Sequence, residues 1–247
     1  MQVALRVRDL VPRERLEGFF SCIHVSQNAA VVGGERSFGF DFAFGPDSTQ
    51  ASVYDNSVKP LIESALSGVN VTVLAYGAPF HQLTVSYPLR LPSTVSPQIC
   101  IWTYSSTIGN DRDYIYIYMS SVGQTGSGKT HTMGTDGLLG KSPDEYGVVP
   151  RIACDVFQAC KEMVGVSIVV SALEIYGEEL RDLINDDTKT RLQIREDRSG
   201  QITVVGLQEV TVSSTDELLE VLGKGTHAGR LMARLTDLSH HSSAEPN

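Results

Sequence analysis

One short glycine-rich segment holds the residues that are best suited to chemistry: Gly123, Gln124, Thr125, Gly126, Ser127, Gly128, Lys129 and Thr130. The segment matches in full the pattern of a phosphate-binding loop, in which a glycine, four variable residues, a glycine, a lysine and a serine or threonine follow one another. Its glycines let the backbone curl, so that successive N–H groups point inward around a phosphate. The segment therefore predicts a nucleoside triphosphate site.

The last two residues of the segment extend this prediction to a metal ion. Lys129 would place a flexible positive charge near the β and γ phosphates. The hydroxyl of Thr130 would ligate Mg²⁺, and a helix beginning there would aim its positive end at the nucleotide. The alternative is a flexible Gly/Ser loop before a helix, with no ligand. An apolar strand before the loop and a helix after it favour the nucleotide site.

A phosphate-binding loop needs a strand that ends at it, and two segments compete for this central position. Val71–Tyr76 is apolar on both faces, as a buried parallel strand should be. Tyr114–Val122 alternates tyrosines with apolar residues, which suits a half-exposed strand better. Both segments lead into a glycine, Gly77 or Gly123. We expect the first segment to be the central strand.

Residues 78–123 differ in character from the rest of the chain. They hold four of the ten prolines, five of the nine tyrosines and the single tryptophan. The prolines lie in the first half of the segment, where they disfavour both a helix and a central strand. Residues 78–123 are therefore expected to form an atypical segment between the predicted central strand and the loop. Deleting 78–123 or 77–122 would join a glycine directly to Gln124.

The remaining sequence alternates strand patterns with helix patterns, which predicts an α/β sheet. Ser214 and Glu217 form a capping box before an apolar helix, and Gly68 is placed to end an earlier one. The closing segment 239–247 is expected to be a disordered tail. Strands are expected at 3–8, 37–44, 166–175, 178–184, 192–194 and 202–212, with a hairpin turn at Ser199-Gly200, and helices at 48–67, from Pro150 and from Ser214.

Composition narrows the classes of partner. Hydrophobic residues make up 41% of the chain and charged residues 20%, as in ordinary soluble globular proteins. A net charge of −9 argues against broad nucleic-acid binding. The four cysteines show no paired CxxC spacing and are expected to be reduced. We find no signal peptide and no apolar run of membrane-spanning length, so a cytoplasmic protein without a membrane partner is expected.

The sequence around the loop resembles the kinesin motor family. Members of that family run Asn-Ala-Thr-Val-Leu-Ala-Tyr-Gly straight into Gln-Thr-Gly-Ser-Gly-Lys-Thr, and this chain has both parts, at 71–77 and 124–130. The resemblance covers roughly residues 2–77 and 123–225, and the chromokinesin branch looks most similar. Further matches are Arg6-Val-Arg8, Gly147-Val-Val-Pro-Arg151, Leu173-Glu-Ile-Tyr-Gly-Glu-Glu-Leu-Arg-Asp-Leu183 and Leu192-Gln-Ile-Arg-Glu-Asp197.

The resemblance implies a P-loop NTPase fold of the kinesin motor type, with a central mostly parallel or mixed sheet flanked by helices. Residues 1–247 would then be a partial motor domain, incomplete on its C-terminal side. The implied cofactors are ATP or ADP with Mg²⁺, the implied partner is the microtubule (tubulin), and the implied place is the cytoskeleton. By the same resemblance Arg8 and His131 would border the adenine. For His131, a role as a helix surface residue is an equal alternative.

Three departures from the family limit what the resemblance implies. The first is residues 78–123, an atypical insert between the strand and the loop, where members of the family have no break. The second is the γ-phosphate sensor Asn-x-x-Ser-Ser-Arg-Ser-His, in which Ala244 replaces the arginine. Ser242 and Ser243 would be relics of this motif, and residues of a disordered tail are an equal alternative. The third is the Asp-Leu-Ala-Gly segment, which these residues do not contain. Nucleotide binding without efficient hydrolysis or motility is therefore expected. The alternatives are an unstable product without activity and an unrelated P-loop kinase or small NTPase.

Overall fold

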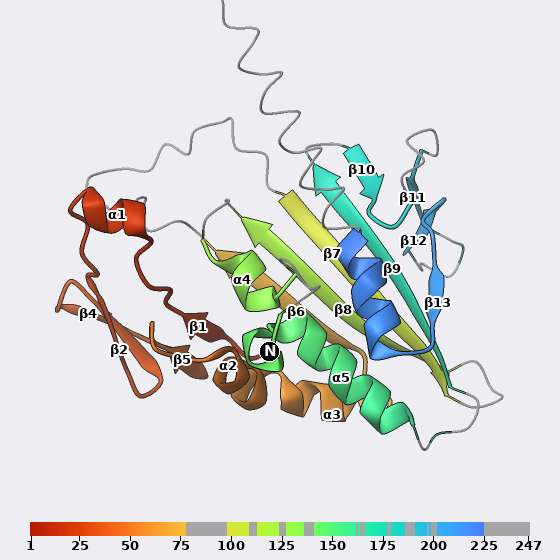
Figure 1. Cartoon of the computed structure of the whole chain (residues 1–247), viewed down its shortest axis with the longest axis horizontal. Helices are drawn as coiled ribbons and strands as arrows, with labels where there is room; N and C mark the ends of the chain where they lie inside the picture. The colour runs from red at the N-terminus through yellow and green to blue at the C-terminus, as the bar shows by residue number, and fades with distance from the viewer. Residues whose placement is uncertain are drawn as a thin grey trace, which may run out of the picture. The chain divides into compact units, whose positions relative to one another are not determined.

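The chain forms two compact units, Met1–Leu61 and Ile62–Asn247. A computed structural model shows their elements (Figure 1). The residues that it describes are 1–77, 98–108, 113–123, 127–135, 141–161, 163, 166–176, 179–185, 191–196, 198 and 202–224. Residues 78–97 and 109–112 of the predicted insert and the predicted tail 239–247 lie outside these residues.

The first unit contains two small sheets. In one, β1 and β5 pair in parallel; in the other, β2, β3 and β4 form an antiparallel meander. The single strand predicted at 37–44 is divided between the two sheets. Its first part is β4, which pairs with β3, and after Asp41 the chain continues as β5, which pairs with β1. There the Asp41 carboxylate accepts a hydrogen bond of 2.7 Å from the Val3 amide. The strands are β1 (Ala4–Arg6), β2 (Ile23–Ser26), β3 (Ala29–Val32), β4 (Arg36–Gly39) and β5 (Phe42–Phe44).

The helix predicted at 48–67 is two helices, α2 (Gln50–Ser57) and α3 (Lys59–Leu66). Thr49 caps α2, since its hydroxyl oxygen accepts a hydrogen bond of 3.0 Å from the Ser52 amide. The break follows from Pro60, which has no N–H to donate to the preceding helical turn. Gly68 ends α3 as predicted, with a φ of +103°. A short helix α1 (Pro12–Leu16) was not predicted.

The second unit is built on a six-stranded mixed sheet in the order β10-β9-β7-β8-β6, with β13 also paired to β9. Only β6 and β8 pair in parallel among the described strands of this sheet. The predicted α/β class is thus confirmed, in its mixed form. The strands are β6 (Val71–Gly77), β7 (Gln98–Ile108), β8 (Asp113–Gly123), β9 (Ser167–Tyr176), β10 (Glu179–Asp182) and β13 (Val210–Val212).

The prediction that Val71–Tyr76 is the central strand is wrong. β8 lies between β7 and β6, whereas β6 lies at the end of the described sheet. Leu74 and Tyr76 of β6 are 59% and 77% exposed, while Ile117 of β8 is 1% exposed. The reason is that residues 78–123 contain both β8 and a strand that pairs with it: β7 pairs with β8 from Ile99↔Val122 to Ile108↔Asp113. With β6 on its other side, β8 has partners on both edges.

Three helices lie on one side of this sheet: α4 (Lys129–Met133), α5 (Val148–Cys160) and the helical residues 215–224 (Figure 1). Pro150 is in the first turn of α5, as predicted, where a missing N–H breaks no helical bond. The predicted cap at Ser214 also forms, with 3.1 Å between the Glu217 amide and the Ser214 hydroxyl oxygen. The carboxylate of Glu217 reaches one residue further back than a capping box requires, to the Ser213 amide.

A separate hairpin joins β11 (Gln193–Glu196) to β12 (Ile202–Val205) in antiparallel register. The pairing of Glu196 with Ile202 fits the predicted hairpin, although its turn at Ser199-Gly200 lies outside the described residues. The strand predicted at 202–212 is divided at Gly206, whose φ is +90°, and its second part becomes β13. Within the described residues, no helix is both long and apolar enough to span a membrane.

Candidate functional site

The end of the glycine-rich loop passes directly into α4. Gly128 has a φ of +91°, in the left-handed region that residues with side chains rarely adopt. Its carbonyl oxygen then accepts a hydrogen bond of 3.0 Å from the Thr132 amide, which closes the first turn of α4. Lys129 and Thr130 are the first two residues of the helix. The left-handed turn thus places both side chains immediately beside the loop.

The lysine is held against the loop itself. Its Nζ donates a hydrogen bond of 2.8 Å to the hydroxyl oxygen of Ser127, and its side chain is half-buried. The neighbouring Thr130 is exposed, as is His131. A lysine ammonium, a threonine hydroxyl and the N–H groups of a loop form the donor set that suits phosphate with Mg²⁺. The described part of the loop therefore fits such a group.

The start of the loop is described only at Gly123, which ends β8 opposite Gly77 of β6. Gln124, Thr125 and Gly126 lie outside the described residues, as do the relic residues Ser242 and Ser243. Their predicted roles stay predictions. Among the described residues, no group of three or more His, Cys, Asp or Glu could hold a metal ion. The predicted metal ligand Thr130 is outside that class of residue.

The far end of α4 is fixed by a contact that the sequence analysis missed. α4 ends at Gly134, where the backbone runs against Gly147 at the start of α5. A Cβ atom on Gly134 would lie 2.5 Å from the Gly147 amide nitrogen, so a side chain there has no space. Arg151 holds the preceding turn, with 2.8 Å between its Nε and the Tyr146 carbonyl oxygen. The available signal was the glycine directly after the helix.

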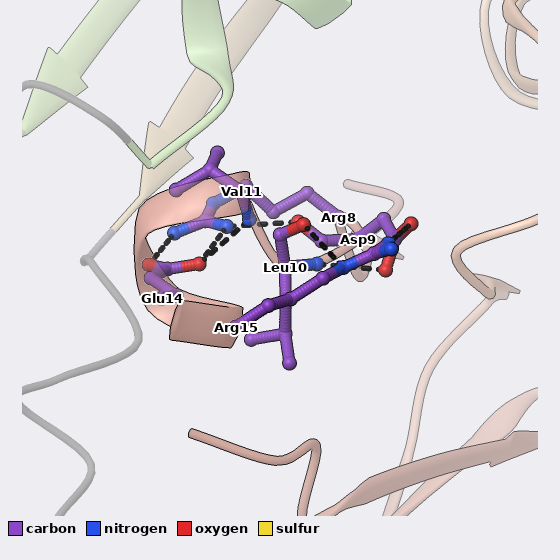
Figure 2. Close-up of polar contacts among 6 residues, drawn as sticks. All are labelled: Arg8, Asp9, Leu10, Val11, Glu14 and Arg15. Atoms are coloured by element: carbon purple, nitrogen blue, oxygen red, sulfur yellow. Dashed lines mark hydrogen bonds and ion pairs between the residues drawn. The ribbon is translucent and has the colours of Figure 1, made fainter. Parts of the chain in front are cut away.

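Arg8, predicted to border the adenine, is held by a carboxylate in its own unit (Figure 2). Its Nη1 donates a 2.7 Å hydrogen bond to Glu14, and its Nη2 donates one of 2.5 Å to the other oxygen of that carboxylate. These hydrogen bonds to Glu14 raise the pKa of Arg8 above its ordinary value. Arg8 belongs to the first unit and the loop to the second. Its role beside the adenine therefore stays a prediction.

Asp9 takes part in the same network. One of its carboxylate oxygens accepts a 2.8 Å hydrogen bond from the Leu10 amide, and the other pairs with Arg15 (Figure 2). The Glu14 carboxylate also accepts a 3.0 Å hydrogen bond from the Val11 amide at the start of α1. Sequence reasoning missed Glu14, although its place three residues after Val11 is that of a capping glutamate.

The family model of the kinesin motor domain matches residues 8–80 and 115–244. The unmatched residues between these two segments fall inside the predicted insert. The match also runs past residue 225, where the resemblance read from the sequence ended, and it includes Ser242 and Ser243.

Similar proteins cover nearly the whole chain. The kinesin-like protein KIF7 of Homo sapiens is 35% identical over 98% of this chain, and that of Mus musculus is 34% identical over 95%. The chromosome-associated kinesin KIF4 of Mus musculus is 32% identical over 92%. This chain spans only 15% of the length of each of these relatives. A solved structure of a fast kinesin superposes with a TM-score of 0.69 at 27% identity, over 94% of this chain and 54% of that one.

Proposed function

We propose that this chain, which belongs to the kinesin motor domain family, binds ATP or ADP with Mg²⁺ through its loop 123–130. The observation that carries the proposal is the arrangement at the end of the loop. Gly128 turns the backbone in the left-handed region, and Lys129 directs its ammonium group to Ser127 within the loop. A positive charge held over a curled backbone is what a phosphate group needs.

Each residue of the site would have a separate task. The Lys129 ammonium would exchange the Ser127 hydroxyl for oxygens of the β and γ phosphates, and the exposed Thr130 hydroxyl would be a ligand to Mg²⁺. The bound nucleotide supplies the phosphoryl group that hydrolysis transfers. His131 and Arg8 would border the base, as the family resemblance implies.

Movement along microtubules, driven by ATP, is the function that the family suggests for the motor to which these residues contribute. The fast kinesin whose structure is similar was analysed for its ATPase mechanism and its interactions with microtubules. For the 247 residues themselves we propose binding without efficient hydrolysis. Phosphoryl transfer depends on several parts acting together, and here Ala244 replaces an arginine of the γ-phosphate sensor.

Thermal unfolding with and without Mg·ATP tests the binding proposal. At a ligand concentration about one hundred times Kd, binding should raise the Tm by about 5–10 °C. Lys129→Ala should abolish this rise, because the ammonium that faces the phosphates is lost. Lys161→Ala is the matched control, since Lys161 is exposed at the end of α5 and its Nζ contacts Gln158. It should keep the full rise.

A chelator separates the metal from the nucleotide. In EDTA the rise caused by ATP should shrink, because Thr130 would have no cation to hold in place against the phosphates. A folded wild-type chain whose Tm does not respond to Mg·ATP would show that the binding proposal is wrong. An equal response from Lys129→Ala would show that the nucleotide binds elsewhere.

A further inference from the structure

We infer that Gly77 is a positioning residue of the phosphate loop, although it lies outside the loop's own motif. The inference rests on the proposed nucleotide binding and adds a residue to that site. In the sequence, Gly77 is only a rival of Gly123 for the first position of the loop. The structure gives the two glycines different tasks.

Both glycines lie at the same level of the sheet. β6 and β8 pair in parallel from Val71↔Ile117 to Gly77↔Gly123, so the two strands end side by side. Gly123 continues into the loop, whereas Gly77 is the last residue of the neighbouring strand. The loop is therefore bordered by two strand ends, one that delivers it and one that lies alongside it.

The approach of Gly77 to the loop leaves no space for a side chain. A Cβ atom on Gly77 would lie 2.7 Å from the hydroxyl oxygen of Ser127, 3.0 Å from its Cβ and 3.5 Å from Cγ of Lys129. The hydroxyl could rotate away. The Ser127 Cβ cannot, because its position is set by the backbone, so the loop itself would have to shift by a few tenths of an ångström.

Such a shift would reach the residue that binds phosphate. The Ser127 hydroxyl oxygen is the acceptor for Lys129 Nζ, at 2.8 Å, so moving Ser127 moves the support of the ammonium group. α4 packs against both β6 and β8, which prevents the helix from following the loop freely. Gly77 thus controls where Ser127 and Lys129 lie relative to the end of the sheet.

The requirement at Gly77 is for space and not for backbone freedom. The φ of Gly77 lies outside the left-handed region, unlike that of Gly128, so alanine could adopt its backbone conformation without strain. Gly39, at the end of β4, shares this ordinary φ but has no atom within 4 Å of a built Cβ. Gly39→Ala is therefore a matched control.

Calorimetric titration of the full chain with Mg·ATP tests the inference. Gly77→Ala should weaken the Kd about tenfold, the effect of a moderate overpacking penalty. Gly39→Ala should change it less than about twofold. The decisive variant is Gly77→Ala combined with Ser127→Gly, which removes both Ser127 atoms that the new methyl group would meet. In the Ser127→Gly background, Gly77→Ala should have almost no further effect on Kd.

The possible outcomes separate the two proposals. If the wild type binds Mg·ATP and Gly77→Ala binds equally well, the inference is wrong while the binding proposal stands. If Gly77→Ala fails to fold, the double variant decides: recovered folding, with binding equal to that of Ser127→Gly alone, supports the contact with Ser127, and continued failure overturns it. If the folded wild type does not bind Mg·ATP, both proposals are overturned together.

Discussion

Two ion pairs hold residues 8–15, and their surroundings give them different weight (Figure 2). Arg8 and Glu14 have side chains that are only 21% and 16% exposed, and they meet through two hydrogen bonds. Arg15 and Asp9 are 59% and 65% exposed. Water screens an exposed pair, so that it contributes about 0–1 kcal/mol, whereas a bidentate, partly buried pair contributes more. The Arg8–Glu14 pair is therefore expected to contribute more to stability than the Arg15–Asp9 pair.

Substituting one acid of each pair tests this difference. Glu14→Gln should lower the free energy of unfolding by about 1–2 kcal/mol, because Arg8 and the Val11 amide lose a charged acceptor. Asp9→Asn should lower it by less than about 0.5 kcal/mol. Urea denaturation of the two variants and the wild type gives both values. Equal losses would mean that exposure does not decide the weight of these pairs.

Glu174 is a buried carboxyl group in the sheet, only 5% exposed. Burial raises its pKa above the ordinary value of 4.5. The charge of Arg181, which lies opposite Glu174 on the neighbouring strand β10, acts in the opposite direction. A raised pKa means that the folded chain holds the proton more tightly than the unfolded chain does. Its stability should therefore fall as the pH rises from 4.5 through the raised value.

Glu174→Gln should remove this pH dependence. Above that interval the variant should be more stable than the wild type, by roughly 1 kcal/mol, because no charge is buried. Below the interval the two should converge. Tm measured between about pH 4 and pH 8 gives the two profiles, within the range where most proteins are stable. Parallel profiles would show that Glu174 is not the group responsible.

At the scale of elements, the helix 215–224 depends on a cap that the sequence already indicated. Ser214→Ala removes the acceptor of the Glu217 amide and should cost about 1 kcal/mol in the free energy of unfolding. Ser57→Ala is the control, because the Ser57 hydroxyl donates to the Val53 carbonyl within α2, a bond that adds little to a helix. Urea denaturation should show a loss for the first variant only. Similar losses for both would remove the special role of the cap.

Local signals explain what could be predicted from the sequence. The helix after the loop, the cap at Ser214, the stop at Gly68 and Pro150 in the first turn of α5 each depend on a few neighbouring residues, and each is found where it was expected. The break between α2 and α3 was predictable in the same way from Pro60, but the apolar spacing of the segment concealed it.

Strand neighbours could not be predicted in this way, because they depend on pairing between distant segments. Val71–Gly77 has the pattern of a buried strand, yet its place in the sheet was decided by β7. The segment 98–108 carries aromatic and β-branched residues that favour a strand, but the prolines preceding it disfavour one. The contacts of Gly77 with Ser127 and of Gly134 with Gly147 likewise join residues that no motif links.

At the scale of the whole molecule, the insert both interrupts the kinesin pattern and supplies two strands of the sheet. β7 is antiparallel to β8 and to β9, so β6, β8 and β9 all run in the same direction. Removing β7 and β8 would leave β6 and β9 as parallel strands that could pair directly. The loop would then follow Gly77 at the end of β6, whereas it now follows Gly123 at the end of β8.

Deleting residues 78–123 tests whether the sheet can close in this way. The shortened chain reads Val71-Thr-Val-Leu-Ala-Tyr-Gly77-Gln124, as the family pattern does, and we expect it to fold and to keep the rise in Tm with Mg·ATP. It loses the buried Ile117 and Met119 together with β8, and β6 would take β9 as its neighbour in place of β8.

Deleting 78–122 is the matched control for this experiment, because it keeps both Gly77 and Gly123 and so lengthens the junction by a single residue. The extra glycine should displace the loop from the end of β6 and weaken the binding of Mg·ATP, while leaving most of the sheet intact. Aggregation of both shortened chains would instead show that β7 and β8 are integral to the sheet. In that case the insert would be part of the fold that holds the phosphate loop, and not an interruption of it.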